Sequence, residues 1–257
     1  MNEYGLVLAG GGARGAYQIG VWQALRDLGI SIKAAVGVSI GAINAALICQ
    51  GDWDLAYQAW HQVSIRDLVK LPEPLPVADD LFDFHNLPAL ARLVIQEKGL
   101  DTTPLRSQLE QYIEEKRLRE SAIEFGLLTY SITDMQPVTV FRQDIQSGQI
   151  LDYILASASM PVFRAVRIEG KRFIDGGVYN NRPTEMLIEK GYQRLIEIEV
   201  GGIGPIRPYN RSGLEIISIK PTRPLGGLMD VRNETLDVSI STGYQDAMEA
   251  MRRHRPV

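Results

Sequence analysis

The chain has 257 residues, of which 45% are hydrophobic and 23% charged, and its formal net charge is −4. These proportions are ordinary for a globular protein, and the length favours one large domain over two. The acidic balance argues against nucleic acid as a partner, because a protein that binds a duplex needs a basic face to replace counterions. The chain shows neither a signal peptide at its start nor a run near the ~18 apolar residues of a membrane span. We therefore expect a cytoplasmic protein.

Two strand–turn–helix units open the chain. Residues 5–9 form an apolar run that ends in three glycines, which predicts a buried strand entering a tight turn. Residues 13–28 have apolar side chains at mostly helical spacing, which predicts a helix. A second apolar run over 32–38 leads to Ser39, and residues 40–49 predict an apolar helix. This alternation is the pattern of a parallel sheet covered by helices on both faces.

The next part of the chain is less regular. Residues 52–70 predict an amphipathic helix. Prolines are dense at about 71–88, and they predict a long surface excursion from a single domain that spans 1–257. This excursion could be a lid or substrate wall, or a connection with no role.

Further helices and strands are predicted along the second half. A helix is expected over 104–120, with its apolar stripe toward the core. Two strand-like runs, at 125–133 and 137–142, could pair with each other. The remaining predicted elements are a short helix at 152–159, a strand at 172–175, a helix at 183–190, strands at 195–200 and 215–219, and a final helix at 236–253.

Ser39 occupies the centre of the turn Gly37-Val38-Ser39-Ile40-Gly41, between a predicted strand and a predicted helix. A Gly-x-Ser-x-Gly turn in this context is typical of the nucleophile elbow of serine hydrolases. Gly37 and Gly41 remove the Cβ atoms that would clash in such a turn, and the helix N-terminus favours the negative charge that develops during attack. The alternative is a tight strand–helix turn without chemistry. The context favours Ser39 as a catalytic nucleophile.

The first glycine turn admits two interpretations. Gly10-x-Gly12-x-x-Gly15 after a strand and before a helix is typical of dinucleotide-binding folds. Such a fold needs an acidic residue about 20 positions further on, and residues 29–36 contain none. A phosphate-binding P-loop also fails, because the required Lys and Ser or Thr are missing. Backbone amides that can bind an anion remain, and beside an activated serine they would form an oxyanion hole, with Gly11 and Gly12 as donors.

A serine nucleophile needs a base, and the chain has three histidines. His61 lies in a predicted amphipathic helix, His85 in the proline-rich excursion and His254 in a basic cluster at the C-terminal end. None of the three follows a strand directly. A triad of Ser39, Asp175 and His254 is formally available, but it would place the base three residues from the last one.

Asp175 is the better candidate for the base. It ends a short predicted strand and precedes Gly176-Gly177, so its carboxylate can project from the sheet edge while the backbone turns sharply. A partly desolvated aspartate there could accept the serine proton directly. The alternative is an ordinary Asp-Gly turn of a hairpin. The lack of a credible histidine favours catalysis.

Three segments together resemble the patatin-like phospholipase family, and they occur in the order of that family: Gly10 to Gly15, Gly37 to Gly41, and Asp175-Gly176-Gly177. The resemblance extends to residues 156–161 and 178–183 and covers most of the first 200 residues. It implies a three-layer α/β/α sandwich with a mostly parallel sheet. It also implies a lipid acyl hydrolase that works through a Ser-Asp dyad without a metal or other cofactor.

Carried over by position, Ser39 would be the nucleophile, Asp175 the base, and the turn with Gly11 and Gly12 the oxyanion hole. Arg14 could hold that turn in shape or attract an anionic headgroup, and the structural role is favoured. The substrate would be a lipid or another acyl ester.

Membrane contact is a weaker hypothesis, drawn from the proline-rich segment itself. Leu81, Phe82 and Phe84 could touch a bilayer surface, although three aspartates beside them would be repelled by anionic lipid. Asn180 and Asn181 would brace the aspartate loop or be simple turn residues. Two other hypotheses are a dinucleotide-binding protein and a membrane-associated scaffold with a dormant site.

Overall fold

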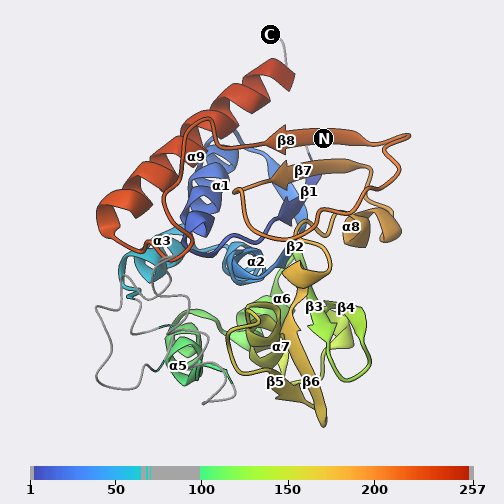
Figure 1. Ribbon diagram of the computed structural model, residues 1–257. Helices are drawn as coiled ribbons and strands as arrows, with labels where there is room; N and C mark the ends of the chain where they lie inside the picture. The colour runs from blue at the N-terminus through green and yellow to red at the C-terminus, as the bar shows by residue number, and fades with distance from the viewer. Residues whose placement is uncertain (1–2, 65–67, 69, 71–98, 255–257) are drawn as a thin grey trace.

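The computed structural model describes residues 3–64, 68, 70 and 99–254. Within these residues one sheet has eight strands in the order β5-β6-β3-β2-β1-β7-β8, with β4 beside β3 (Figure 1). The strands are β1 (Glu3–Leu8), β2 (Ser31–Val38), β3 (Glu124–Ser131), β4 (Gln136–Phe141), β5 (Val166–Ile168), β6 (Lys171–Asp175), β7 (Arg194–Ile198) and β8 (Glu215–Ile219). The neighbours β3, β2, β1, β7 and β8 are parallel, whereas β4, β5 and β6 form antiparallel pairs.

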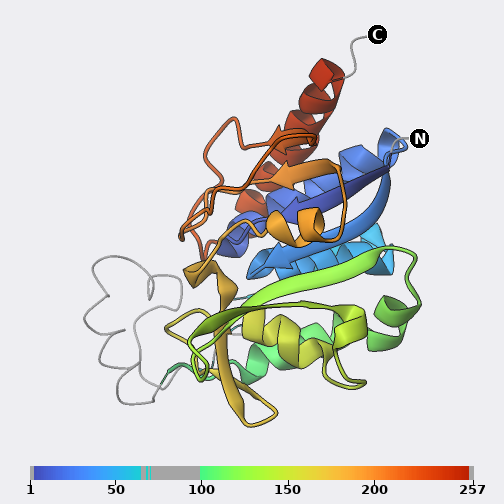
Figure 2. The same cartoon turned by 90° about the vertical axis from the view of Figure 1, so that its right-hand side faces the viewer.

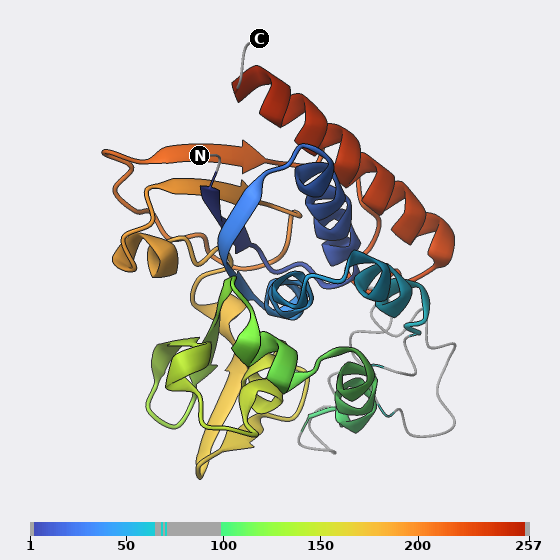
Figure 3. The same cartoon turned by 180° about the vertical axis from the view of Figure 1, so that it is seen from behind.

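Helices cover both faces of this sheet. They are α1 (Ala16–Asp27), α2 (Ile40–Gln50), α3 (Trp53–His61), α5 (Thr103–Tyr112), α6 (Glu115–Glu120), α7 (Ile150–Ser157), α8 (Glu185–Glu189) and α9 (Asn233–His254). In Figure 1 the sheet separates α8 from α1 and α9, and Figure 3 shows α1 and α9 side by side from behind. None of the described helices is long and apolar enough to cross a membrane.

Two hydrophobic cores lie on opposite faces of the sheet. Leu6 and Leu8 of β1 pack in the larger core with α1, α2 and α9. Val7 between them packs in the smaller core with Met186 and Leu187 of α8. Successive side chains of a strand point to opposite faces, so the apolar run predicted as a buried strand serves both cores. The predicted three-layer sandwich with a mostly parallel sheet is confirmed.

The predicted helix over 104–120 is wrong, because the chain breaks it into α5 and α6. Ile113 and Glu114 have extended backbone angles, with ψ near 111° and 112°. The side chain of Gln50 forms hydrogen bonds with the backbone at the break. It donates to the carbonyl of Tyr112 at 2.8 Å and accepts from the N–H of Glu114 at 2.6 Å. A contact across more than 60 residues therefore replaces helical hydrogen bonds that the local pattern predicts.

Other element predictions differ at their ends. The pairing predicted between 125–133 and 137–142 is confirmed by the antiparallel pair β3–β4. The helix predicted to begin at residue 13 starts with a 3₁₀ turn, Gly12–Gly15, and the N–H of Ala13 donates to the carbonyl of Leu228. The helix predicted over 52–70 ends at His61. The proline-rich stretch at 71–88 lies outside the described residues, and the single-domain assignment stays a prediction.

Candidate active site

The carboxyl ends of two strands meet along β3. β4 covers one edge of β3, so the other edge is shared by β2 and β6. Val38, the last residue of β2, pairs with Leu128, and Asp175, the last residue of β6, pairs with the adjacent Thr129. β2 runs parallel to β3 and β6 antiparallel to it, so the two strands point toward each other. This register places Ser39, which follows β2 directly, beside Asp175.

Ser39 has the strained backbone of a sharp strand–helix turn. Its φ of 58° and ψ of −131° lie outside the regions that residues with a Cβ normally adopt. A Cβ on Gly37 would clash with the carbonyl of Gly41, and a Cβ on Gly41 would clash with the carbonyl of Leu8. The N–H of Ser39 donates to the hydroxyl of Ser157 at 3.0 Å, which helps to hold this conformation. The turn predicted from the Gly-x-Ser-x-Gly pattern is formed, with Ser39 at the start of α2.

Asp175 is a buried carboxyl with few partners. It is 5% exposed, and it accepts a hydrogen bond from the backbone N–H of Gly177 at 2.7 Å, while the side chain of Ser39 lies close enough to lower its pKa. Burial raises the pKa of Asp175 to about 6, because it penalises the charged form, and the interactions with Ser39 and with the N–H of Gly177 oppose this rise. A carboxylate with this pKa, beside a serine hydroxyl, has the properties of a general base near neutral pH.

One short segment contacts the backbone of both residues. Ser157 accepts the N–H of Ser39, and the carbonyl of Ser159, two residues on, accepts the N–H of Asp175 at 2.7 Å. From the sequence, residues 156–161 are part of the family resemblance, and no role is predicted for them. The contacts show that this segment, at the end of α7, fixes Ser39 and Asp175 relative to each other.

The glycine turn lies directly against Ser39. A Cβ on Gly10 would come within 3.0 Å of the Ser39 Cβ. The N–H of Gly10 donates to the carbonyl of Asn181 and that of Ala13 donates to Leu228. Gly11 and Gly12 lie between Gly10 and Ala13 in the chain. Their N–H groups donate to no other residue within the described part of the chain. Two amides beside the serine are thus available to an anion, and they are the two that the sequence predicts as oxyanion donors.

Polar side chains brace this turn from outside. Arg14 donates to the carbonyls of Gly201 and Gly226, contacts that hold the turn in shape. Asn181 donates from its side chain to the carbonyl of Gly10 at 3.1 Å, so it braces the glycine turn rather than the aspartate loop alone. Three further glycines of the motifs are also closely packed. A Cβ added to Gly15 would crowd Ile40, one added to Gly176 would crowd Leu128, and one added to Gly177 would crowd Asp175.

The described histidines have other partners. His61 contacts the carbonyl of Tyr57 and, at 2.8 Å, the carboxylate of Asp237. His254 contacts Glu215 at 2.9 Å. His85 lies outside the described residues. Neither His61 nor His254 contacts Ser39, so the geometry favours Asp175 over the triad with His254.

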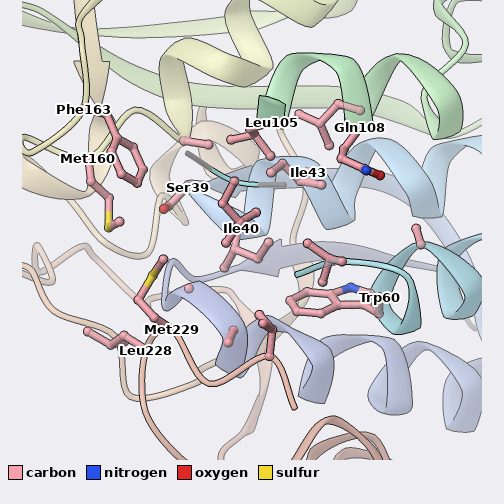
Figure 4. A pocket seen from close by; sticks show the side chains of 18 of the residues that line it. Ser39, Ile40, Ile43, Trp60, Leu105, Gln108, Met160, Phe163, Leu228 and Met229 are labelled. Atoms are coloured by element: carbon pink, nitrogen blue, oxygen red, sulfur yellow. The ribbon is translucent and has the colours of Figure 1, made fainter. Parts of the chain in front are cut away.

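An apolar pocket extends from Ser39 between α2, α3 and α5. In Figure 4, Met160, Phe163 and Met229 lie at the Ser39 end, and Trp60 and Gln108 lie further in. Its lining comprises Gly12, Ala13, Ser39, Ile40, Ile43, Ala59, Trp60, Val63, Leu68, Leu105, Gln108, Leu109, Tyr112, Ala158, Met160, Phe163, Leu228, Met229 and Val231. Nearly all of these side chains are apolar, which suits a hydrocarbon chain whose reacting carbon lies at Ser39.

Residues 6–188 match the family model described as patatin-like phospholipase. The chain belongs to this family. It is 25% identical over 203 residues to patatin-like phospholipase domain-containing protein 7 of Rattus norvegicus, covering 78% of this chain and 14% of that protein. It is 28% identical over 210 residues to lysophospholipase nte1 of Aspergillus terreus, covering 80% of this chain and 12% of that protein. The chain thus spans about an eighth of the length of these relatives.

A solved structure shares the patatin-like fold. The crystal structure of VipD from Legionella pneumophila superposes with a TM-score of 0.62 at 16% identity, covering 99% of this chain and 67% of that one. At this identity the likeness concerns the fold alone.

The pocket of this patatin-like chain reaches beyond the region matched by the family model. Leu228, Met229 and Val231 line it from the loop before α9, whereas the match ends at residue 188. The sequence does not identify these three residues. The prediction that the apolar stripe of α5 faces the core is confirmed, since Leu105 and Leu109 belong to the larger core, and both also line the pocket. An apolar stripe on a helix has the same pattern whether or not a pocket lies beside it, so only the tertiary structure reveals this second role.

Proposed function

We propose that the chain is a serine lipid acyl hydrolase that cleaves fatty acyl esters through a Ser39–Asp175 dyad. The observation that carries the proposal is the buried Asp175 carboxyl beside Ser39, which itself lines an apolar pocket. Membership of the patatin-like phospholipase family and the similarity to a fungal lysophospholipase support a lipid ester as the substrate. The apolar wall beside the glycine turn gives no support to dinucleotide binding.

The proposed reaction has two halves. Asp175 takes the hydroxyl proton of Ser39 as its oxygen attacks the acyl carbonyl carbon, and the amides of Gly11 and Gly12 stabilise the oxyanion. The carbon–oxygen bond of the ester breaks, and the departing alcohol takes the proton from Asp175. Water then gives a proton to Asp175 and attacks the acyl-enzyme. The fatty acid leaves, and Ser39 recovers its proton.

Labelling with a fluorophosphonate probe tests the nucleophile. We expect the probe to modify Ser39 and to leave the Ser39→Ala variant unmodified, as seen by mass spectrometry of the intact protein and of its peptides. Ser241 provides a matched control, because it is an exposed serine of α9. Its replacement by Ala should leave labelling unchanged. Labelling that persists in Ser39→Ala would refute the assignment.

The base is tested by turnover of a soluble p-nitrophenyl ester. Asp175→Asn keeps an acceptor for the N–H of Gly177 but removes the base, so we expect turnover to fall by about 10²–10⁴-fold. His61→Gln and His254→Gln should leave turnover near its normal value. Near-normal activity of Asp175→Asn, or loss of activity in either histidine variant, would contradict the dyad.

A further inference from the structure

Three exposed apolar side chains lie beside the proposed catalytic residues. Ile203, Ile206 and Val178 are 80%, 47% and 40% exposed, and we call these three the apolar rim. They come from two loops, one after β6 and one after β7, that lie side by side at the left-hand edge of the sheet in Figure 2. The N–H of Asn181 donates to the carbonyl of Pro205 at 2.7 Å, which joins the two loops.

Close backbone approaches fix the place of the rim. Gly202 packs so tightly on the carbonyl of Gly10 that a Cβ would clash there, and Gly204 does the same on the carbonyl of Gly177. Ile203 lies between these two glycines, so it stands over the boundary between the glycine turn and the Asp175 turn. Its high exposure therefore lies next to the two turns of the proposed site and not on a remote face.

The loop that carries Ile203 and Ile206 is positively charged, although the chain as a whole is negative. Residues 201–213 carry Arg207 and Arg211 and no Asp or Glu. The Arg207 guanidinium lies 3.8 Å from the centre of the Tyr179 ring and donates to the carbonyl of that residue. Among the described residues no carboxylate forms a salt bridge with Arg207. Its charge is thus held beside the rim and open to an anionic partner.

We propose that the apolar rim and Arg207 dock the protein on the surface of a phospholipid bilayer that carries anionic headgroups. Ile203, Ile206 and Val178 enter the interface, and Arg207 pairs with lipid phosphate. The choice of a bilayer rests in part on the proposed function, because a site next to the rim would take an acyl chain from the bilayer into the pocket. This surface differs from the membrane contact through Leu81, Phe82 and Phe84 that the sequence suggests, and those residues lie outside the described part of the chain.

Vesicle sedimentation tests the proposal without any need for turnover. We use the Ser39→Ala background, so that no hydrolysis alters vesicles of phosphatidylcholine alone or mixed with phosphatidylglycerol. Ile203→Asp should weaken binding to the mixed vesicles about tenfold, since it removes an apolar side chain that enters the bilayer and adds a charge that anionic lipid repels. Arg207→Gln should reduce the preference for mixed vesicles over phosphatidylcholine. Val238→Asp is the control, because Val238 is 49% exposed on α9, and it should bind normally.

An activity comparison in the wild-type background gives a second readout. Ile203→Asp should lower hydrolysis of vesicle lipid while leaving turnover of a soluble short-chain ester unchanged. Vesicle binding that is equal in Ile203→Asp and the parent would overturn the proposal. Light scattering gives the oligomeric state of Ile203→Asp. A changed oligomeric state with unchanged vesicle binding would also overturn the proposal, because the rim would then be a protein interface. Absence of turnover with normal rim-dependent binding would refute the proposed function and leave the docking surface standing.

Discussion

The hydroxyl of Ser157 accepts the backbone N–H of Ser39 at 3.0 Å and donates to the carbonyl of Leu128 at 2.7 Å. Leu128 is also the residue of β3 that pairs with Val38, immediately before the serine. Ser157 therefore joins the strained turn to the central strand at the point where the strand pairing of β2 ends. Because Ser157 is fully buried, no water replaces it as the partner of either group.

The first prediction concerns Ser157 as a positioning residue. Ser157→Ala leaves the N–H of Ser39 without its acceptor in a buried site, which should destabilise the fold by about 1–3 kcal/mol. It should also lower kcat about tenfold with little change in KM, since a misplaced nucleophile affects the reaction more than binding. Kinetics with a soluble ester and denaturant unfolding measure the two effects.

Ser159→Ala is the matched control for Ser157→Ala. Its hydroxyl donates to the carbonyl of Arg164, whereas the contact with Asp175 uses the backbone carbonyl and survives the substitution. We expect a similar loss of stability with kcat largely retained. Equal losses of kcat in the two variants would show that Ser157 acts only through stability.

The second prediction is the pH dependence of turnover. Asp175 must be deprotonated to accept a proton, and burial raises its pKa to about 6. The kcat/KM for a soluble ester should therefore fall tenfold per pH unit below about pH 6 and level off above it. A pH–rate profile in buffers of constant ionic strength measures this limb. A limb centred near pH 4, the range of an ordinary aspartate, would contradict a desolvated base.

The sequence predicts the reacting groups better than their surroundings, for a physical reason. Ser39 and the turn at Gly10 to Gly15 belong to local strand–turn–helix patterns, so nearby residues specify them. Asp175 is predicted from the Gly-Gly turn after a short strand and from the lack of a credible histidine. Its approach to Ser39 depends on the register of two strands on β3, which no local pattern encodes. The break at Ile113 likewise depends on Gln50, far away in the chain.

The third prediction links Asp175 to stability. Its pKa is raised from 3.8 to about 6, so the folded state holds the proton more tightly than the unfolded state does. The wild type should thus lose stability relative to Asp175→Asn as the pH rises from about 4 to 8, by about 2–3 kcal/mol. Urea unfolding of both proteins at several pH values measures the difference. A difference that does not vary with pH would show that the carboxyl is not desolvated.

The fourth prediction concerns the length of the acyl chain. Leu105 is 9% exposed and lines the pocket, and Figure 4 places it between Ser39 and Gln108. Leu105→Trp should fill the inner part of the pocket, so kcat/KM should fall about tenfold or more for long-chain esters and little for acetate or butyrate esters. A series of p-nitrophenyl esters of increasing length measures the change.

Gln111→Trp is the control for this substitution, because it adds the same side chain at an exposed position of α5 that does not line the pocket. It should leave the chain-length profile unchanged. The comparison separates a filled pocket from a disturbed helix, since only the former discriminates between substrates. An equal loss for short and long esters in Leu105→Trp would mean that the acyl chain does not occupy this pocket.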